Sequence, residues 1–246
     1  MILGKNISLG KVETTLKQSL QSCWEFEETS GTTVYDSAGL LNIYTSGAIT
    51  STTGKTGLCY NYGGSFYNYA TTSNYTNYSA ITVSAWCLST RTMNGEVDNR
   101  VIVSKLHTSW ANPYYNFQLR LTDYTQKTYE WAVGGSSTYG ALGAGINYFT
   151  NNSLQNQWVH VVGTYSSSEN LMTLHINNSH VVSTSATLGN TGTVSSSFQI
   201  GDAPLYTYFY PWIGKIDQVA IWNRKLTTQE ISTLYNSGNG LPFWDW

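Results

Sequence analysis

The sequence of 246 residues contains few charges, few cysteines and few prolines. Charged residues make up 11% of the chain and the formal net charge is -2, so no basic surface for nucleic acid is indicated. No run approaches the roughly 18 apolar residues of a membrane-spanning helix. The N-terminus lacks a basic segment followed by an apolar core, so no signal peptide is recognised. We therefore expect neither a nucleic-acid partner nor a membrane-spanning helix.

The three cysteines, Cys23, Cys59 and Cys87, each lie within an apparent strand. Their odd number argues against a disulfide framework, and we expect buried free thiols. The sequence has no Cys-x-x-Cys motif and no Cys/His cluster, which argues against a zinc site.

Aromatic and small polar residues are abundant instead. The chain has 19 Tyr, 9 Trp and 22 Gly, with much Ser, Thr and Asn, and this composition favours β-structure with long polar loops. Surfaces rich in Tyr, Ser and Asn suit adaptable recognition. A β-protein with a well-hydrated surface is the alternative explanation.

About twelve short strand-like segments are separated by turn residues, without the strand–helix alternation of a parallel sheet. The first, residues 22–27, places Trp24 and Phe26 on one face. This pattern predicts a two-sheet antiparallel sandwich in a single domain, residues 21–246. Residues 1–20 are expected to form an N-terminal arm that packs on the domain or anchors it to a larger assembly. A loosely ordered terminus is the alternative.

The closing strand-like segment, residues 212–223, alternates strictly from Ile216. The alternation places Asp217 within an apolar run, where a buried carboxylate needs a hydrogen-bond donor, a basic side chain or a metal ion. A capping box from Thr227 to Glu230 then predicts a short helix. The alternation assigns Ile216, Gln218, Ala220 and Trp222 to one face and Asp217, Val219 and Ile221 to the other.

The number and order of short motifs resemble a laminin-G-like jelly roll. The resemblance covers roughly residues 21–241. The motifs are Trp-x-Phe-x-Glu at 24–28, Ser-Gly at 30–31, Asp-Ser-x-Gly at 36–39, Gly-Lys-x-Gly at 54–57, and the strand-like segments 82–86, 158–165, 174–178 and 214–227.

This resemblance implies an all-β fold, a concanavalin A-like jelly-roll sandwich of two antiparallel sheets with one short C-terminal helical turn. Such modules bind carbohydrates, proteins or cell-surface ligands, and they occur in adhesins and in phage structural proteins. Two functional hypotheses follow. The first is a non-catalytic recognition or adhesion module, a lectin that binds a glycan or a surface partner. The second is a decoration protein of a virus particle, anchored by its N-terminal arm.

The second hypothesis implies capsid or tail proteins as partners. Either hypothesis places the chain outside the cell or on a virion surface, and homo-oligomerisation stays open under both.

The same broad fold includes glucanases, which the resemblance implies carry acidic residues at period-two spacing on one strand. Glycoside hydrolysis needs two carboxylates, about 5 Å apart in retaining enzymes. Glu96 and Asp98 have the spacing but lie in a loop-like segment, and Glu25 and Glu27 lie on the first strand, at what we expect to be a solvated edge. We therefore expect no enzyme activity.

Related jelly rolls often hold a calcium ion with Asp carboxylates, backbone carbonyls and water. The resemblance makes Asp36, Asp202 and Asp217 the candidate ligands of a structural calcium ion. A turn cap is the alternative for Asp36, and a salt bridge or a hydrogen-bonded core carboxylate is the alternative for Asp217.

Aromatic residues on loops are the candidates for ligand binding, because flat rings stack on sugars and anchor interfaces. The alternative is that half of these rings pack beneath the loops. The candidates are Tyr206, Tyr208, Phe209, Tyr210 and Trp212 in the densest loop, and Trp110 and Tyr114 in another.

Overall fold

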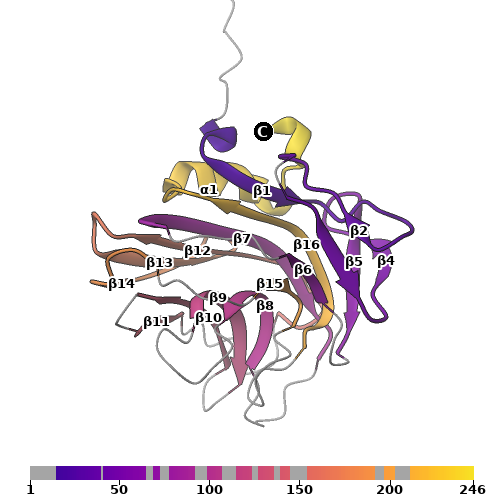
Figure 1. Ribbon diagram of the computed structural model, residues 1–246, viewed down its shortest axis with the longest axis horizontal. Coiled ribbons are helices and arrows are strands. Elements are labelled where there is room, and N and C mark those ends of the chain that lie inside the picture. Colours follow the sequence, from indigo (N-terminus) through magenta and orange to yellow (C-terminus); the bar gives the residue numbers. More distant parts are fainter. Residues whose placement is uncertain are drawn as a thin grey trace, which may run out of the picture.

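The computed structural model describes residues 15–39, 41–64, 69–72, 78–91, 99–106, 115–123, 127–135, 139–144, 154–191, 197–202 and 211–246. Two antiparallel sheets of eight strands each pack face to face (Figure 1). The predicted all-β, two-sheet antiparallel sandwich with a short C-terminal helix is confirmed. No helix in the described part of the chain is long and apolar enough to cross a membrane.

Sheet A contains the first and last strands of the fold. Its order is β14-β13-β12-β7-β16-β5-β4, and β1 pairs with β16 beyond this path. The strands are β1 (Leu20–Trp24), β4 (Thr50–Thr53), β5 (Leu58–Gly63), β7 (Ala80–Ser89), β12 (Val159–Ser166), β13 (Leu171–Ile176), β14 (His180–Ser185) and β16 (Ile213–Trp222).

In Figure 1, strands β8 to β11 of sheet B lie below sheet A, whereas β2 and β6 lie at the right, beside β4, β5 and β16 of sheet A. The order of sheet B is β11-β10-β9-β8-β15-β6-β3-β2. The strands are β2 (Thr33–Val34), β3 (Ile43–Ser46), β6 (Tyr69–Thr72), β8 (Asn99–Leu106), β9 (Tyr115–Asp123), β10 (Lys127–Gly134), β11 (Tyr139–Ala144) and β15 (Phe198–Ile200).

The main core fills the space between the sheets. Trp24 and Phe26 are both fully buried there, as expected, and Trp24 stacks on Phe198 with ring centroids 5.2 Å apart. The expected strand over residues 22–27 ends at Trp24, however, so Phe26 reaches the core from outside β1, with a left-handed φ of 58°. Trp131 donates from Nε1 to the carbonyl of Thr164 on the opposite sheet, at 3.0 Å. A Cβ atom at Gly163 would lie 2.2 Å from Cδ2 of Trp131, so this position of β12 requires glycine.

A second apolar cluster covers the outer face of sheet A. It is built by α1 (Thr228–Tyr235), the C-terminal tail and the short helix η1 (Thr15–Lys17), together with outward-facing strand residues. Leu16 and Leu20 are buried in it, so residues 16–20 pack on the domain. This is one of the two roles expected for an arm. Residues 1–14 lie outside the described residues, and the assembly role stays a prediction.

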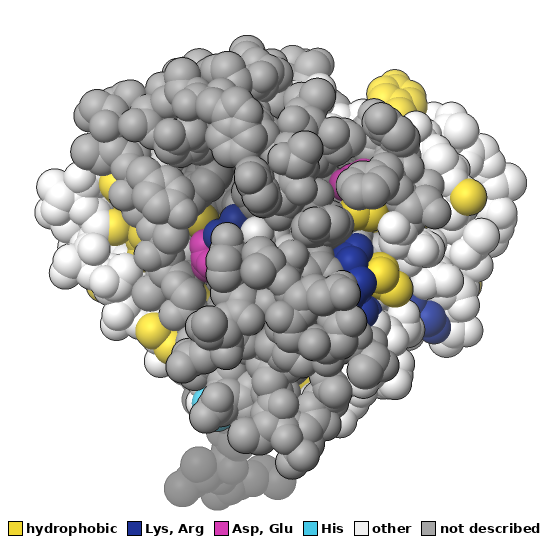
Figure 2. Space-filling model, turned by 90° about the horizontal axis from the view of Figure 1, so that it is seen from below, with side chains coloured by type: hydrophobic (Ala, Val, Ile, Leu, Met, Phe, Trp, Pro, Cys, Tyr) yellow, Lys and Arg dark blue, Asp and Glu magenta, His cyan; other side chains and the backbone are white. Residues whose placement is uncertain are grey.

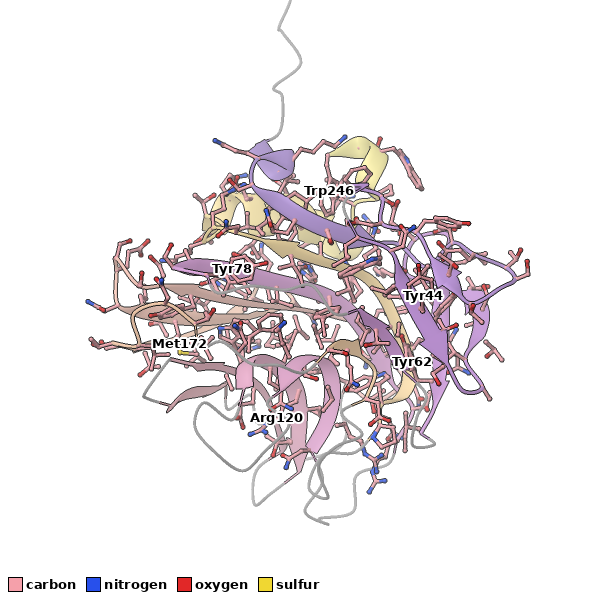
Figure 3. The ribbon with its side chains drawn as sticks, in the orientation of Figure 1. Tyr44, Tyr62, Tyr78, Arg120, Met172 and Trp246 are labelled. Carbon is pink, nitrogen blue, oxygen red and sulfur yellow. The ribbon has the colours of Figure 1, made fainter. Side chains whose placement is uncertain are left out.

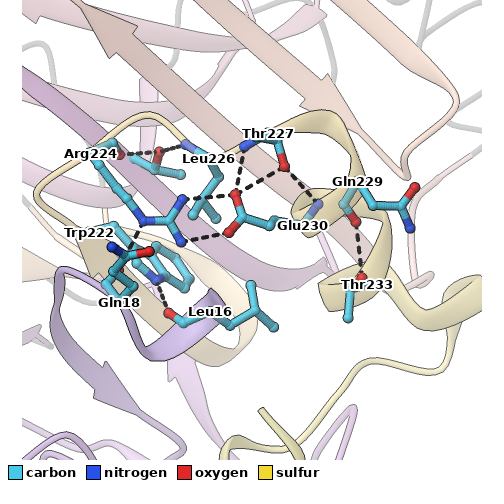
Figure 4. Close-up of polar contacts among 10 residues, drawn as sticks. Leu16, Gln18, Trp222, Arg224, Leu226, Thr227, Gln229, Glu230 and Thr233 are labelled. Carbon is cyan, nitrogen blue, oxygen red and sulfur yellow. Dashed lines mark hydrogen bonds and ion pairs between the residues drawn. The ribbon is translucent and has the colours of Figure 1, made fainter. Parts of the chain in front are cut away.

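Polar contacts fix this cover in place (Figure 4). Trp222 donates from Nε1 to the carbonyl of Leu16 at 2.6 Å. Arg224 makes two bonds to the carboxylate of Glu230, whose backbone N–H is capped by Thr227. The predicted capping box is confirmed, with η2 (Asn236–Gly238) and η3 (Phe243–Asp245) following the helix.

The predicted faces of the closing strand are wrong beyond Asp217. Asp217 lies opposite Trp86 and Ala220 lies opposite Ser84, so β16 has one extra residue between them. Gln218 accommodates this β-bulge with a left-handed φ of 47°. As a result Val219 and Ile221 share the core face with Ile216, while Ala220 and Trp222 face the outer cluster.

The three cysteines are free and buried, as expected. Cys59 and Cys87 each have a pKa raised to about 12, chiefly by burial, so neither is a ready nucleophile.

Candidate functional site

The outer face of sheet B is polar across five neighbouring strands. The pairing register places one residue of each strand directly opposite the next, on the face away from sheet A. Four strand spacings make this line roughly 19 Å long. We call it the polar row: Tyr44 on β3, Thr71 on β6, Gln199 on β15, Ser104 on β8 and Gln118 on β9.

A charged network adjoins the polar row. Arg120 donates from Nη1 to Oε1 of Gln118 at 2.9 Å and forms an ion pair with Glu130 on β10. The side chains of Arg120 and Glu130 are only 11% and 14% exposed, so the pair is held in a fixed arrangement. Figure 3 shows Arg120 on the side of sheet B that faces away from sheet A. Figure 2 looks onto this side and shows acidic and basic side chains near its centre, between residues that are not described.

Two exposed tyrosines lie at the β2 edge of the same sheet. Tyr44 is 55% exposed and pairs with Thr33, while Tyr35, directly after β2, is 63% exposed. Their neighbours Val34 and Ile43 point into the core, so the alternation directs the tyrosines outward. A flat ring beside hydroxyl and amide groups is the combination that binds the apolar face and the hydroxyls of a sugar.

The aromatic loop residues expected at the site are for the most part outside the described residues. This holds for Tyr206, Tyr208, Phe209, Tyr210, Trp110 and Tyr114. Trp212 is described and is fully buried in the main core, where Nε1 donates to the carbonyl of Lys215 at 3.2 Å. Trp212 therefore packs beneath the loop, which was the alternative to a role in ligand binding.

Asp36 organises a turn. Its carboxylate accepts the backbone N–H groups of Cys23, Ala38 and Leu41 at 2.8 to 2.9 Å. This arrangement matches the turn-cap alternative and ties β1 to the segment after β2.

Asp217 holds the Gly-Lys-x-Gly turn at residues 54–57. Its Oδ2 accepts the backbone N–H groups of Lys55 at 2.7 Å and Thr56 at 3.1 Å. A Cβ atom at Gly54 would lie 2.6 Å from the same oxygen, so glycine allows the close approach. Burial raises the pKa of Asp217 to about 8, against the lowering effect of the N–H groups.

Asp202 is fully buried just after β15. Among the described residues, no three His, Cys, Asp or Glu side chains form a group that could hold a metal ion. Calcium therefore stays a prediction, and the donors around Asp36 and Asp217 are N–H groups rather than further oxygen ligands.

The paired acids considered for catalysis also have structural contacts. Glu25 accepts the hydroxyl of Ser37 and the backbone N–H of Phe243, and Glu27 accepts the backbone N–H of Leu58. Glu25 thus fixes the C-terminal tail and Glu27 fixes the start of β5. Glu96 and Asp98 lie outside the described residues.

The sequence profile of a laminin G family, described as the concanavalin A-like lectin/glucanases superfamily, matches residues 62–232, more than half of the chain. The chain belongs to the concanavalin A-like lectin/glucanases superfamily. A search of curated proteins finds no match. The predicted laminin-G-like fold is confirmed by the family match.

Solved structures of toxin binding domains resemble this superfamily member in fold. The binding domain of Paraclostridial Mosquitocidal Protein 1 matches with a TM-score of 0.68 and 16% identity over 91% of this chain and 53% of that chain. The ligand binding domain of botulinum neurotoxin serotype D, in complex with N-acetylneuraminic acid, matches with a TM-score of 0.69 and 13% identity over 89% and 51%. The binding domain of botulinum neurotoxin DC, in complex with SialylT, matches with 0.69 and 12% over 90% and 52%.

These identities establish a shared fold. The chain spans about half the length of the toxin domains it matches. The predictions of a virion partner, of a location and of an oligomer concern properties that these comparisons do not address, and they stay predictions.

The polar row and the exposed tyrosines were not predicted from the sequence. Neither Tyr35 nor Tyr44 was singled out, although each directly follows a buried β-branched residue, Val34 or Ile43. That short alternation is the signal that could have found them. The polar row itself has no signal in the sequence, because its members come from five strands whose order in the sheet is not their order in the chain.

Proposed function

We propose that this chain is a non-catalytic carbohydrate-recognition module and that the outer face of sheet B binds the glycan. The observation that supports this proposal most directly is the polar row, which begins at an exposed tyrosine and continues through hydroxyl and amide side chains. All the helices among the described residues cover sheet A, and none of them lies over the outer face of sheet B (Figure 1). Along the polar row Tyr44 is exposed, whereas Ser104 and Gln118 are buried, so the tyrosine end of the row is the part that meets a ligand first.

The contacts along this face fit a hydroxylated ligand. Tyr44 offers a ring, Gln199 offers an amide, and the ion pair of Arg120 with Glu130 offers directed donors and acceptors. Sugars are bound through such fixed planar groups, because each hydroxyl needs a donor or an acceptor when it leaves water. The superfamily and the glycan complexes of two structurally similar toxin domains add support by analogy.

A glycosidase mechanism receives less support. Among the side chains that the structure describes on the strands of sheet B, Glu130 is the carboxylate of the outer face, and it is paired with Arg120. Hydrolysis requires a second carboxylate at a defined separation. We therefore place recognition, without bond cleavage, at this face.

A glycan array with the purified chain tests the proposal. We expect at least one glycan to bind, and the variant Tyr44→Ala to bind it about tenfold more weakly, a loss of about 1.4 kcal/mol. Trp244→Ala is the matched control, because Trp244 is 63% exposed but lies in the C-terminal tail on the other side of the molecule. A blank array with a folded protein, or equal losses for both variants, would contradict the proposal. Release of free sugar from the bound glycan would contradict its non-catalytic part.

A further inference from the structure

A groove of about 490 Å³ lies on the outer face of sheet A, on the opposite side of the molecule from the polar row. Its floor is formed by the outward residues of β13 and β14, next to the N-terminal end of α1. One wall of the groove is the segment before α1, which contains Lys225 and Leu226. The volume lies within the range of sites for small ligands.

The floor contains a buried histidine with an unused nitrogen. His175 is 4% exposed, and its Nε2 lies 3.1 Å from the hydroxyl of Thr173. Its Nδ1 is also buried and has no hydrogen-bond partner. A buried polar atom without a partner is costly, so a ligand atom that supplies the missing hydrogen bond binds favourably.

The hydroxyl chain on the floor makes Nδ1 adaptable. Thr173 also lies 2.6 Å from the hydroxyl of Thr164, and either hydroxyl can donate to the other. If Thr173 donates to Thr164, it accepts from Nε2 of His175 and leaves Nδ1 as an acceptor. If Thr164 donates instead, Thr173 donates to Nε2, and Nδ1 carries the proton. A hydroxyl group can complete either arrangement, whereas a carboxylate or an ammonium group can complete only one.

The charges around the groove balance one another. Lys225 forms an ion pair with Glu169 at the rim, so the groove presents no excess charge of either sign. Burial and the nearby charge of Lys225 lower the pKa of His175, which keeps the imidazole neutral near pH 7. The walls between these groups are apolar, from Leu171, Val181 and Leu226.

We propose that this groove is a second ligand site that takes an uncharged mono- or disaccharide, with a sugar hydroxyl on Nδ1 of His175 and an apolar sugar face against Leu171 and Val181. The site is separate from the polar row, so the two sites would bind independently of each other. This inference rests on the groove alone and holds whether or not the outer face of sheet B binds a glycan.

Nitrogen-15 NMR of the histidine rings tests the site directly, with lactose, maltose and cellobiose as probes and N-acetylneuraminic acid as the charged comparison. We expect at least one of the three neutral disaccharides to shift the Nδ1 resonance of His175 with a millimolar dissociation constant. No shift with any of the three would overturn the proposal. A response to N-acetylneuraminic acid alone would overturn the neutral character of the site.

Two variants confirm the location. His175→Phe removes both ring nitrogens, and Val181→Arg fills the groove from a residue that is 53% exposed and so leaves the fold intact. Each should weaken disaccharide binding by at least tenfold, while Thr50→Arg on β4, the other edge strand of sheet A, should not. If His175→Phe does not fold, Val181→Arg still decides, because unchanged binding in that variant would place the sugar elsewhere. Tyr44→Ala in the same assay separates this site from the polar row.

Discussion

The outer faces of the two sheets differ in what the chain places on them. Sheet A presents Val162, Ala220 and Trp222 outward and covers them with α1, the C-terminal tail and residues 16–20. Sheet B presents Gln118, Arg120 and other polar groups, with no helix among the described residues over them. The inner faces are alike, because both supply the shared core. In this fold the inner faces therefore form the core of the sandwich. The outer face of sheet A is apolar and anchors residues 16–20 and the C-terminal tail, whereas the outer face of sheet B is polar and suited to recognition.

The largest effect should come from removing the central ring of the cover on sheet A. Trp222 is fully buried, donates to the carbonyl of Leu16 and stacks on Trp246 with centroids 5.5 Å apart. Trp222→Ala should lower the free energy of unfolding by about 3–5 kcal/mol, because it leaves a cavity and an unpaired carbonyl. Tyr44→Ala on the outer face of sheet B should cost less than about 0.5 kcal/mol. Urea unfolding measures both, and similar losses would remove the distinction between the faces.

The next effect concerns pH and the carboxylate on the outer side of β16. Asp217 has a folded pKa raised to about 8 from 3.8, so between about pH 4 and pH 8 the folded chain binds more protons than the unfolded chain. The contribution of Asp217 to the free energy of unfolding should therefore be fully present below about pH 4. It should fall as the pH rises towards 8, by at most about 1.4 kcal/mol per pH unit. Asp217→Asn should flatten this slope in unfolding curves recorded across that range. An unchanged slope would show that Asp217 is ionised in the folded state.

A smaller effect compares one ion pair on each outer face. The pair Arg120–Glu130 on sheet B has side chains 11% and 14% exposed, whereas Lys225–Glu169 on sheet A has 23% and 51%. Double-mutant cycles to alanine should give a coupling energy of about 1–2 kcal/mol for the first and below about 0.5 kcal/mol for the second. The reverse order would mean that solvent screens the pair on sheet B as well, and would weaken the case for a preorganised polar face.

The same contrast explains how far the sequence leads. The two-sheet sandwich, the core face of Trp24 and the capping box follow from local patterns, because each depends on residues close together in the chain. The number of strands does not, since about twelve were expected and the described residues form sixteen. The faces of β16 do not, since a single extra residue at Gln218 reverses the alternation and the sequence carries no glycine or turn motif there to reveal it.

The two candidate sites were harder to predict for a related reason. The polar row depends on β15 lying between β6 and β8, which are separated from it by many residues in the chain. The groove depends on the segment before α1 lying over β13 and β14. Both are products of topology, and periodicity along one strand contains no information about its neighbours.

The smallest expected effect concerns the aspartates at which calcium was predicted. The carboxylate oxygens of Asp36 and Asp217 already accept backbone N–H groups, three for Asp36 and two for Oδ2 of Asp217. An N–H group directed at an oxygen occupies a lone pair that a calcium ion would use. EDTA should therefore shift the melting temperature by less than about 1 °C, whereas a site saturated at a hundred times its dissociation constant contributes about 2.7 kcal/mol, or about 5 °C and more at this chain length. A larger fall in the melting temperature that added calcium reverses would support the calcium prediction. The variant Asp202→Asn, just after β15, would then show whether the ion lies at sheet B.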